Sequence, residues 1–163
     1  PARYYTKVIE DGGVTVRLVF VDTTPLIDKY RQESDKYPDA CKQDIQKQLD
    51  WVDSTLTAAK EDWVIVLGHH PIYADTDKND TERTDICGHI HNFQHIKQKG
   101  CDIDYVVNTS GSLSRPKVNP VEGTQYCSGI PGFSLVTADK QELSLHLMDK
   151  DGKVVYTVRH AKK

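Results

Sequence analysis

The chain has 163 residues, enough for about one domain with one sizeable core. Its formal net charge of −3 is mild, and no basic stripe argues for nucleic acid as a partner. No apolar run approaches the roughly 20 residues of a membrane-spanning helix, so composition excludes that class.

The four cysteines indicate neither a zinc knuckle nor a dense disulfide scaffold, because Cys41, Cys87, Cys101 and Cys127 are spread out without a CxxC pair. Two interpretations of the cysteines remain open: one disulfide in an exported protein, or four thiols. The sequence enters a strand pattern at once, without a leader, as expected of a chain that begins inside a domain.

The first third predicts a β-hairpin followed by a helix. Residues 3–9 and 14–21 have strand patterns on either side of the turn signal Asp11-Gly12-Gly13. Asp22-Thr23-Thr24-Pro25 is typical of a turn, and we assign Asp22 a structural role. Residues 26–38 predict a loop with a possible helical turn.

A long amphipathic helix is predicted over residues 40–60, with Asp39 as a possible N-cap. Its apolar face follows steps of three and four residues, at Ile45, Leu49, Val52, Leu56 and Ala59. The apolar run at 63–67 then predicts a buried strand, so this part of the chain has the pattern of an α/β layer.

The middle of the chain is a polar stretch, residues 74–85. Its aspartates lack the glycine and terminal glutamate of an EF-hand, so we predict a solvated loop rather than a calcium site. Ile86-Cys87 predicts a very short strand.

The last part predicts strands and one long loop. We expect a helical turn at 93–99, a strand at 103–108 and a loop over 112–132. Alternating strands follow at 133–137, 143–148 and 154–158, joined by turns into antiparallel hairpins. The predicted fold class is α/β, with a mixed sheet, antiparallel C-terminal strands and a single domain over residues 1–163.

Histidines concentrate at two predicted strand ends. Five of the seven lie between His69 and His95, and four of these are in Gly68-His69-His70-Pro71 and in Gly88-His89-Ile90-His91. Gly88 lets the chain bend sharply. Ligands bind at the carboxyl ends of strands in α/β folds, and His89 and His91 point the same way in an extended segment.

Because imidazole is a common metal ligand, we predict that His69, His89 and His91 bind a transition metal. His70 points away from His69 in an extended segment, which indicates a substrate-facing, outer-sphere or packed residue. His95 is expected to be an outer-sphere or surface residue. His146 and His160 are expected to be ordinary exposed residues in the C-terminal strands.

Both histidine motifs resemble the last two signature blocks of the calcineurin-like metallophosphoesterases. The segments 19–25 and Asn92-Phe93 make the chain more similar to the purple, tartrate-resistant type, acid phosphatases. The resemblance covers residues 1 to about 135. It implies half of a four-layer αββα sandwich, the C-terminal portion of a metallophosphoesterase domain.

The resemblance implies a hydrolase of phosphate monoesters that uses a dinuclear metal centre and attack by a metal-bound hydroxide. Iron paired with iron, zinc or manganese would be the cofactor. His69 and His89 would bind one metal and His91 the other; His70 and His95 are the catalytic candidates, and Asn92 and His95 lie in the outer sphere.

The chain departs from the family in two places. The Asp-x-His, Gly-Asp and Gly-Asn-His blocks and the tyrosine ligand are not in it, and residues 74–85 replace a helix and most of a strand. It therefore carries about half of the ligands, and we expect it alone to be nearly inactive. The missing N-terminal half or a second chain is the expected partner, and export is the implied localisation.

Two alternatives stay open. One is a phosphodiesterase or nucleotide pyrophosphatase on the same scaffold. The other is a non-catalytic chain: either a half-domain that folds only with its N-terminal partner, or a degenerate metal-binding module.

Overall fold

The computed structural model describes residues 2–71 and 89–162. They form two compact units, one up to His69 and one from His70 onward. The expected short strand at Ile86-Cys87, the loop at 74–85 and Gly88 lie outside the described residues. No helix in the described ranges is long and apolar enough to cross a membrane.

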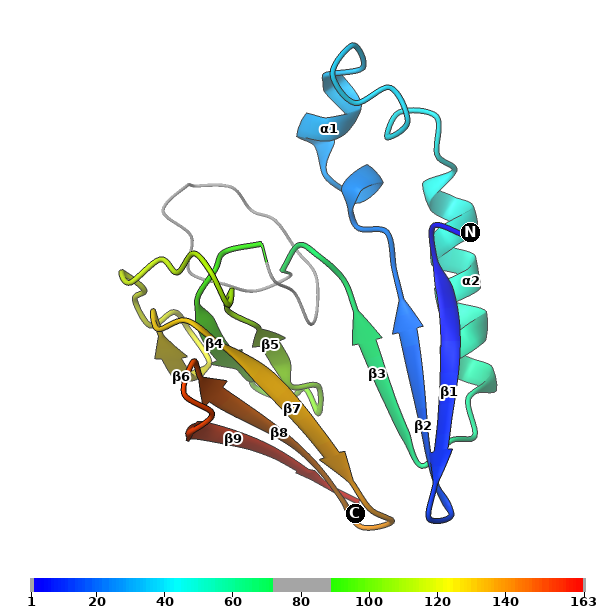
Figure 1. The fold of residues 1–163 in the computed structure, drawn as a ribbon. Helices are drawn as coiled ribbons and strands as arrows, with labels where there is room; N and C mark the ends of the chain where they lie inside the picture. The colour runs from blue at the N-terminus through cyan, green and yellow to red at the C-terminus, as the bar shows by residue number, and fades with distance from the viewer. Residues whose placement is uncertain (1, 72–88, 163) are drawn as a thin grey trace. The chain divides into compact units, whose positions relative to one another are not determined.

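The first unit is a β-α-β arrangement (Figure 1). Strands β1 (Tyr5–Asp11) and β2 (Val14–Phe20) form an antiparallel hairpin, and β3 (Trp63–Leu67) pairs with β2 in parallel. Gly12 and Gly13 both have positive φ, at 55° and 77°, which suits the tight two-residue turn. The predicted hairpin and turn are confirmed, and so is a strand over residues 63–67; only Trp63 and Ile65 of this strand are buried, and Val64 is exposed.

Between β2 and β3 the chain forms a short 3₁₀ turn, η1 (Thr24–Leu26), and two helices, α1 (Asp28–Gln32) and α2 (Ile45–Ala58). The long helix begins five residues later than the sequence predicts. Asp44 is its N-cap, because the Asp44 side chain accepts a hydrogen bond from the backbone N–H of Lys47 at 3.0 Å. Asp39 instead accepts a hydrogen bond from the Arg3 guanidinium.

Helix α2 buries only part of the predicted apolar face. Ile45, Val52 and Ala59 are half-buried, but Leu49 and Leu56 are exposed, whereas Gln48 is 2 % exposed. The Gln48 side chain accepts a hydrogen bond from the backbone N–H of Asp22 and donates one to the backbone carbonyl of Asp22, at 2.8 and 3.0 Å. These two bonds tie the helix to the end of β2.

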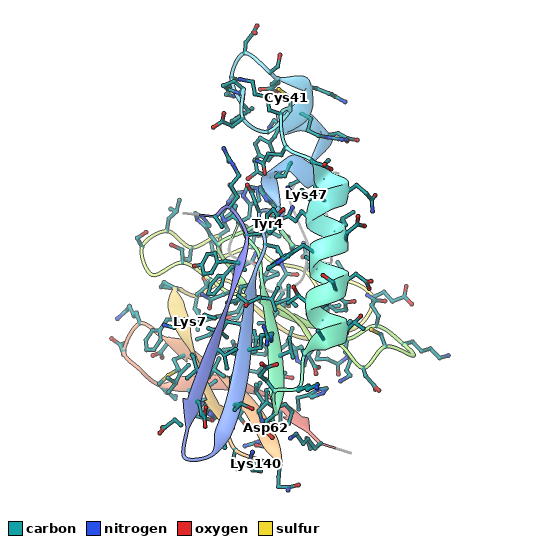
Figure 2. The ribbon with its side chains drawn as sticks, turned by 90° about the vertical axis from the view of Figure 1, so that its right-hand side faces the viewer. Tyr4, Lys7, Cys41, Lys47, Asp62 and Lys140 are labelled. Carbon is teal, nitrogen blue, oxygen red and sulfur yellow. The ribbon has the colours of Figure 1, made fainter. Side chains whose placement is uncertain are left out.

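Ionic and polar contacts fix the segment between α2 and β3. The Arg17 guanidinium donates from Nε and Nη2 to Glu61 at 2.9 and 2.5 Å. Asp62, labelled near the foot of the strands in Figure 2, accepts from the N–H and hydroxyl of Thr15. These contacts set the point where β3 begins, and β3 runs from there to the first histidine motif.

The second unit contains two antiparallel three-stranded sheets (Figure 1). One has the order β5-β4-β6, from β4 (Phe93–Ile96), β5 (Tyr105–Val107) and β6 (Thr124–Ser128). The other is a meander of β7 (Gly132–Ala138), β8 (Glu142–Asp149) and β9 (Val154–Ala161). The three predicted C-terminal strands are confirmed.

The core of this unit draws on both of its sheets. Phe93 and Val106 of the first sheet form one buried cluster with Leu145, Leu147 and Val158 of the second. Tyr126 and Tyr156 extend the cluster, with rings stacked at 4.3 Å between centroids. The two sheets therefore share one hydrophobic core.

Two predictions for this unit are wrong. Residues 93–96 form the central strand β4 instead of a helical turn, and β6 interrupts the loop predicted over 112–132. All four residues of β4 are buried. Gln94 and His95 are polar although buried, so β4 shows neither the alternating nor the continuously apolar pattern of a strand.

Candidate metal centre

Strand β3 leads into the first histidine motif at Gly68, where the chain is closely packed. A Cβ atom at this position would lie 2.8 Å from the Thr23 side chain and 3.3 Å from that of Val21. Thr23 is 2 % exposed and has little room to move. The glycine is therefore required by close packing, and it sets where His69 leaves the strand.

His70 and His89 lie together at the start of the second unit. Their ring centroids are 4.8 Å apart, with the ring planes tilted by 49°. His70 is 2 % exposed and His89 is half-buried. Two imidazoles so close, one of them buried, form a compact pair of potential ligands.

His69 precedes His70 directly in the chain. One potential ligand atom from each of His69, His70 and His89 lies within 4.8 Å of the others. Within the described ranges, no other group of three or more His, Cys, Asp or Glu side chains meets this condition. The donor set is all imidazole, which suits zinc, iron or copper better than magnesium or calcium.

His91 does not belong to this group, but it has two unusual features. Its φ is +60°, and it is the one non-glycine residue with positive φ among the described residues. Its Nδ1 atom is buried and finds no hydrogen-bond partner in the part of the chain that the structure describes. A buried orphaned nitrogen is costly, and a metal ion would satisfy it, so this residue fits the predicted ligand set.

His95 is held on both ring nitrogens inside the second unit. Nδ1 lies 3.1 Å from the Tyr156 hydroxyl, and Nε2 lies 2.9 Å from Oδ1 of Asp104. The side chain is 6 % exposed. The structure therefore gives His95 a place in a buried polar network.

Asp104 is the centre of that network. It also accepts hydrogen bonds from His160 at 3.0 Å and from the Lys97 ammonium at 3.2 Å. Burial by itself would raise the pKa of Asp104, but the hydrogen bonds from His95, His160 and Lys97 outweigh it and hold the pKa well below its ordinary range.

The other histidines and Asp22 have structural partners. His146 lies between the hydroxyls of Thr137 and Thr157, and His160 is bonded to Asp104, so both are only half-exposed and not the fully exposed residues that we expected. Asp22 accepts from the backbone N–H of Thr24 and from the Gln43 amide. These contacts agree with the structural role predicted for Asp22.

Sequence reasoning missed Asp104 and Tyr156. Neither stands in a motif. Asp104 meets His95 through the pairing of β4 with β5, and Tyr156 meets it through the packing of β9, which is distant in sequence. The alternating pattern of β9 could have placed Tyr156 and His160 on one face, since they are four residues apart. Asn92 is buried and accepts a hydrogen bond from the Gln94 amide at 2.9 Å.

The fold is that of a metallophosphoesterase-like half-domain. A solved structure described as "GAP50 the anchor in the inner membrane complex of Plasmodium" superposes with a TM-score of 0.73 and 21 % identity. The match covers 98 % of this chain and 54 % of that one. The predicted fold class is therefore confirmed.

The homologues of the chain are tartrate-resistant and purple acid phosphatases. Tartrate-resistant acid phosphatase type 5 is 25 % identical in Rattus norvegicus and 26 % in Mus musculus, in each case over 96 % of this chain. Purple acid phosphatase 17 of Arabidopsis thaliana is 27 % identical over 65 % of the chain and 38 % of its own length. No profile of a known protein family matches the chain.

The chain spans about half the length of the curated relatives it matches, 56 % of the rat and mouse enzymes. This share agrees with the predicted C-terminal half of a phosphatase domain.

Proposed function

We propose that this chain is the C-terminal part of a metal-dependent phosphoric ester hydrolase that acts on phosphate monoesters. The observation that carries the proposal is the approach of potential ligand atoms of His69, His70 and His89 to within 4.8 Å of one another. The homology to acid phosphatases supplies the reaction class.

Within this proposal the imidazoles divide into ligands and supporting residues. His69, His89 and His91 bind the metal ions, as the resemblance implies, and His91 contributes its buried Nδ1, which has no partner among the described residues. Metal ions held by these residues would polarise the phosphoryl group and would supply the nucleophile. Iron with iron, zinc or manganese suits the donors.

His70 and His95 take different parts. His70 is buried against His89, so it acts beside the ligands, orienting the His89 ring or contacting the phosphate. His95 is bonded to Tyr156 and Asp104, so it acts as a supporting residue behind the site and holds no substrate proton.

Metal binding by the 163-residue chain is the first test. Cobalt(II) titration, followed by its visible absorption, is expected to show one metal per chain, shared by His69, His89 and His91, because the blocks expected to bridge two metals are not in this sequence. His89→Ala weakens binding at least tenfold, whereas the control His146→Ala leaves it unchanged. Equal binding by both variants contradicts the assignment.

The isolated chain is proposed to have little or no turnover, since it lacks the aspartate-bearing blocks expected to bridge two metals. Hydrolysis of p-nitrophenyl phosphate with added metal tests this point, and robust activity would show that the chain is self-sufficient. A longer protein that includes an N-terminal half, or mixing with such a half as a second chain, is expected to restore activity. Export from the cytoplasm belongs to the same proposal, and cell fractionation tests it.

Two alternatives to the main proposal can each be distinguished from it by one measurement. A phosphodiesterase or nucleotide pyrophosphatase would hydrolyse bis(p-nitrophenyl) phosphate faster than the monoester in the intact protein. A non-catalytic half-domain is favoured by the solved relative described as an anchor. Absence of turnover from the intact, metal-loaded protein would select that alternative.

A further inference from the structure

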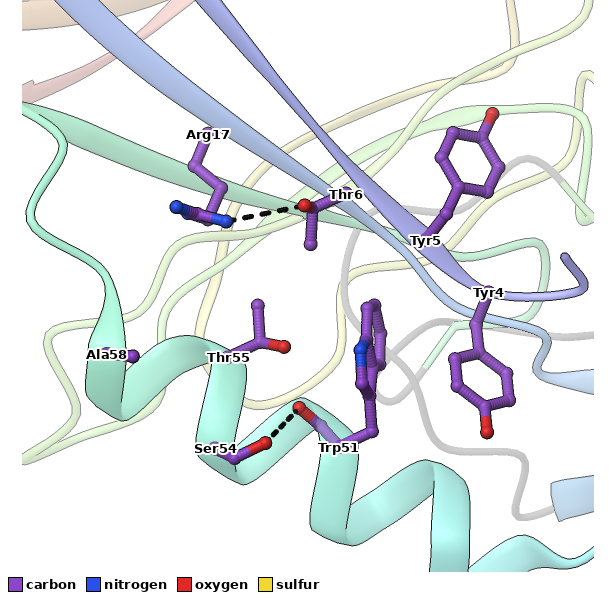
Figure 3. A pocket seen from close by; sticks show the side chains of 8 residues that line it. All are labelled: Tyr4, Tyr5, Thr6, Arg17, Trp51, Ser54, Thr55 and Ala58. Carbon is purple, nitrogen blue, oxygen red and sulfur yellow. Dashed lines mark hydrogen bonds between the residues drawn. The ribbon is translucent and has the colours of Figure 1, made fainter.

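A groove lies between helix α2 and the beginning of the β-hairpin in the first unit (Figure 3). Its volume is about 650 Å³, within the range of small-molecule sites. It is lined by Tyr4, Tyr5, Thr6, Arg17, Trp51, Ser54, Thr55 and Ala58. None of these residues takes part in the candidate metal centre.

Aromatic rings form one wall of the groove. Tyr4 and Trp51 are in contact, with centroids 4.8 Å apart and planes tilted by 49°. Tyr5 stacks on Phe20 at 4.5 Å, and its ring points away from α2, on the opposite side of β1 from the ring of Tyr4 (Figure 3). The rings of Tyr4 and Trp51 therefore form the wall, and they leave no parallel-sided slot between them.

Polar groups line the rest of the groove and carry no net charge. Glu61 neutralises Arg17, and the hydrogen bonds that it accepts from Arg17 hold the pKa of Glu61 at about 2, so both stay ionised over the neutral range. Arg17 also donates from Nη1 to the Thr6 hydroxyl at 3.3 Å.

Further donors and acceptors face the same space. Thr55 lines the groove with its hydroxyl, and the indole nitrogen of Trp51 is on the ring edge that faces Thr55 (Figure 3). The Ser54 hydroxyl donates to the backbone carbonyl of Trp51 at 2.9 Å, so it can serve a ligand only as an acceptor. Hydroxyls both donate and accept, whereas the indole N–H only donates. The groove therefore offers mixed hydrogen-bonding groups beside apolar ring faces.

We propose that this groove binds a neutral carbohydrate. A sugar ring presents C–H faces that pack on aromatic rings, and it presents hydroxyls at its edge that pair with mixed donors and acceptors. An anion is disfavoured because the one cation in the lining is already paired with Glu61. A nucleobase is disfavoured because Tyr4 and Trp51 touch each other and leave no slot between them.

Tryptophan fluorescence provides the test, since the chain has only Trp51 and the buried Trp63. The 163-residue chain is titrated with maltose, cellobiose, lactose and N,N′-diacetylchitobiose up to millimolar concentration. At least one disaccharide is expected to change the emission in a saturable way, while inorganic phosphate and a proline decapeptide have no effect.

Variants separate groove binding from other causes. Trp51→Ala and Thr55→Ala are each expected to weaken binding, followed by calorimetry, on the order of tenfold. Thr57→Ala is the matched control, because Thr57 lies on the same helix outside the groove. Circular dichroism confirms that each variant folds, and if Trp51→Ala does not fold, Thr55→Ala and Trp51→Phe decide.

The proposal is overturned if none of the four sugars binds. It is also overturned if Thr55→Ala binds as well as Thr57→Ala, or if phosphate or the peptide binds in place of sugar.

Discussion

Nε2 of His95 and Oδ1 of Asp104 lie 2.9 Å apart, joining the central strand β4 to the residue before β5. The other Asp104 oxygen accepts a hydrogen bond from His160 of β9, and the other His95 nitrogen meets Tyr156 of the same strand. One carboxylate thus connects both sheets of the second unit. The network lies on the strand that continues directly from the His89-Ile90-His91 motif.

Asp104→Asn is expected to destabilise the chain by about 2 to 4 kcal/mol, because the new amide group cannot accept every hydrogen bond that the carboxylate accepts. Chemical denaturation followed by circular dichroism measures the change. Asp151→Asn is the control, since Asp151 pairs with Lys150 at the surface with a 73 % exposed side chain. It should change stability by less than about 0.5 kcal/mol, and equal effects of the two variants would contradict the role of Asp104.

Lowering the pH should remove the contribution of Asp104 to the stability of the folded chain. Its folded pKa is lowered from the ordinary 3.8, so the carboxylate stabilises the folded state above about pH 4. That contribution is lost progressively as the pH falls from there toward the lowered pKa. The free energy of unfolding is measured for the parent chain and for Asp104→Asn at several pH values from 7 to 2.5. The difference between the two proteins should be constant at the upper end of this range and should shrink below pH 4. A difference that stays constant down to pH 2.5 would refute the assignment.

Gly68→Ala is expected to lower the free energy of unfolding by about 1 to 3 kcal/mol, because the new methyl group would lie 2.8 Å from the Thr23 side chain. Thermal unfolding measures this change. Gly111→Ala makes the same substitution where no atom lies within 4 Å, and it should be nearly neutral. Comparable melting temperatures for the two variants would show that the strand end tolerates a side chain.

His91→Asn separates metal binding from folding. Asparagine tolerates positive φ better than most residues, so the backbone at φ +60° should survive the change. The melting temperature of the metal-free chain is expected to stay within a few degrees of the parent, while cobalt(II) binding weakens at least tenfold. Unchanged cobalt affinity would exclude His91 from the ligand set.

The sequence predicted the elements whose patterns are local. Gly12-Gly13 indicated the hairpin, and the apolar run at 63–67 matched β3 residue for residue. The histidine motifs carried the resemblance to the acid phosphatases, and homology confirmed it. The roles of His69, His70, His89 and His91 stay predictions.

Spatial neighbours were harder to predict. The apolar spacing predicted that Leu49 and Leu56 of α2 are buried, but they are exposed, and Gln48 is buried with two hydrogen bonds to Asp22. A hydrophobic pattern ranks residues by polarity and does not record that a buried amide has hydrogen-bond partners. Strand β4 was missed for the same reason, since Gln94 and His95 are polar although buried.

The sequence by itself determined the fold class, the resemblance to the acid phosphatases and the histidines that are candidates for metal binding, because these depend on residue types at short spacing. Only the tertiary structure decided that His95 is held by Asp104 and Tyr156, that the Nδ1 atom of His91 is buried without a partner among the described residues, and that a groove with aromatic rings and hydroxyls lies beside α2. Each of these depends on groups that packing brings together from distant parts of the chain, and no local pattern records such contacts.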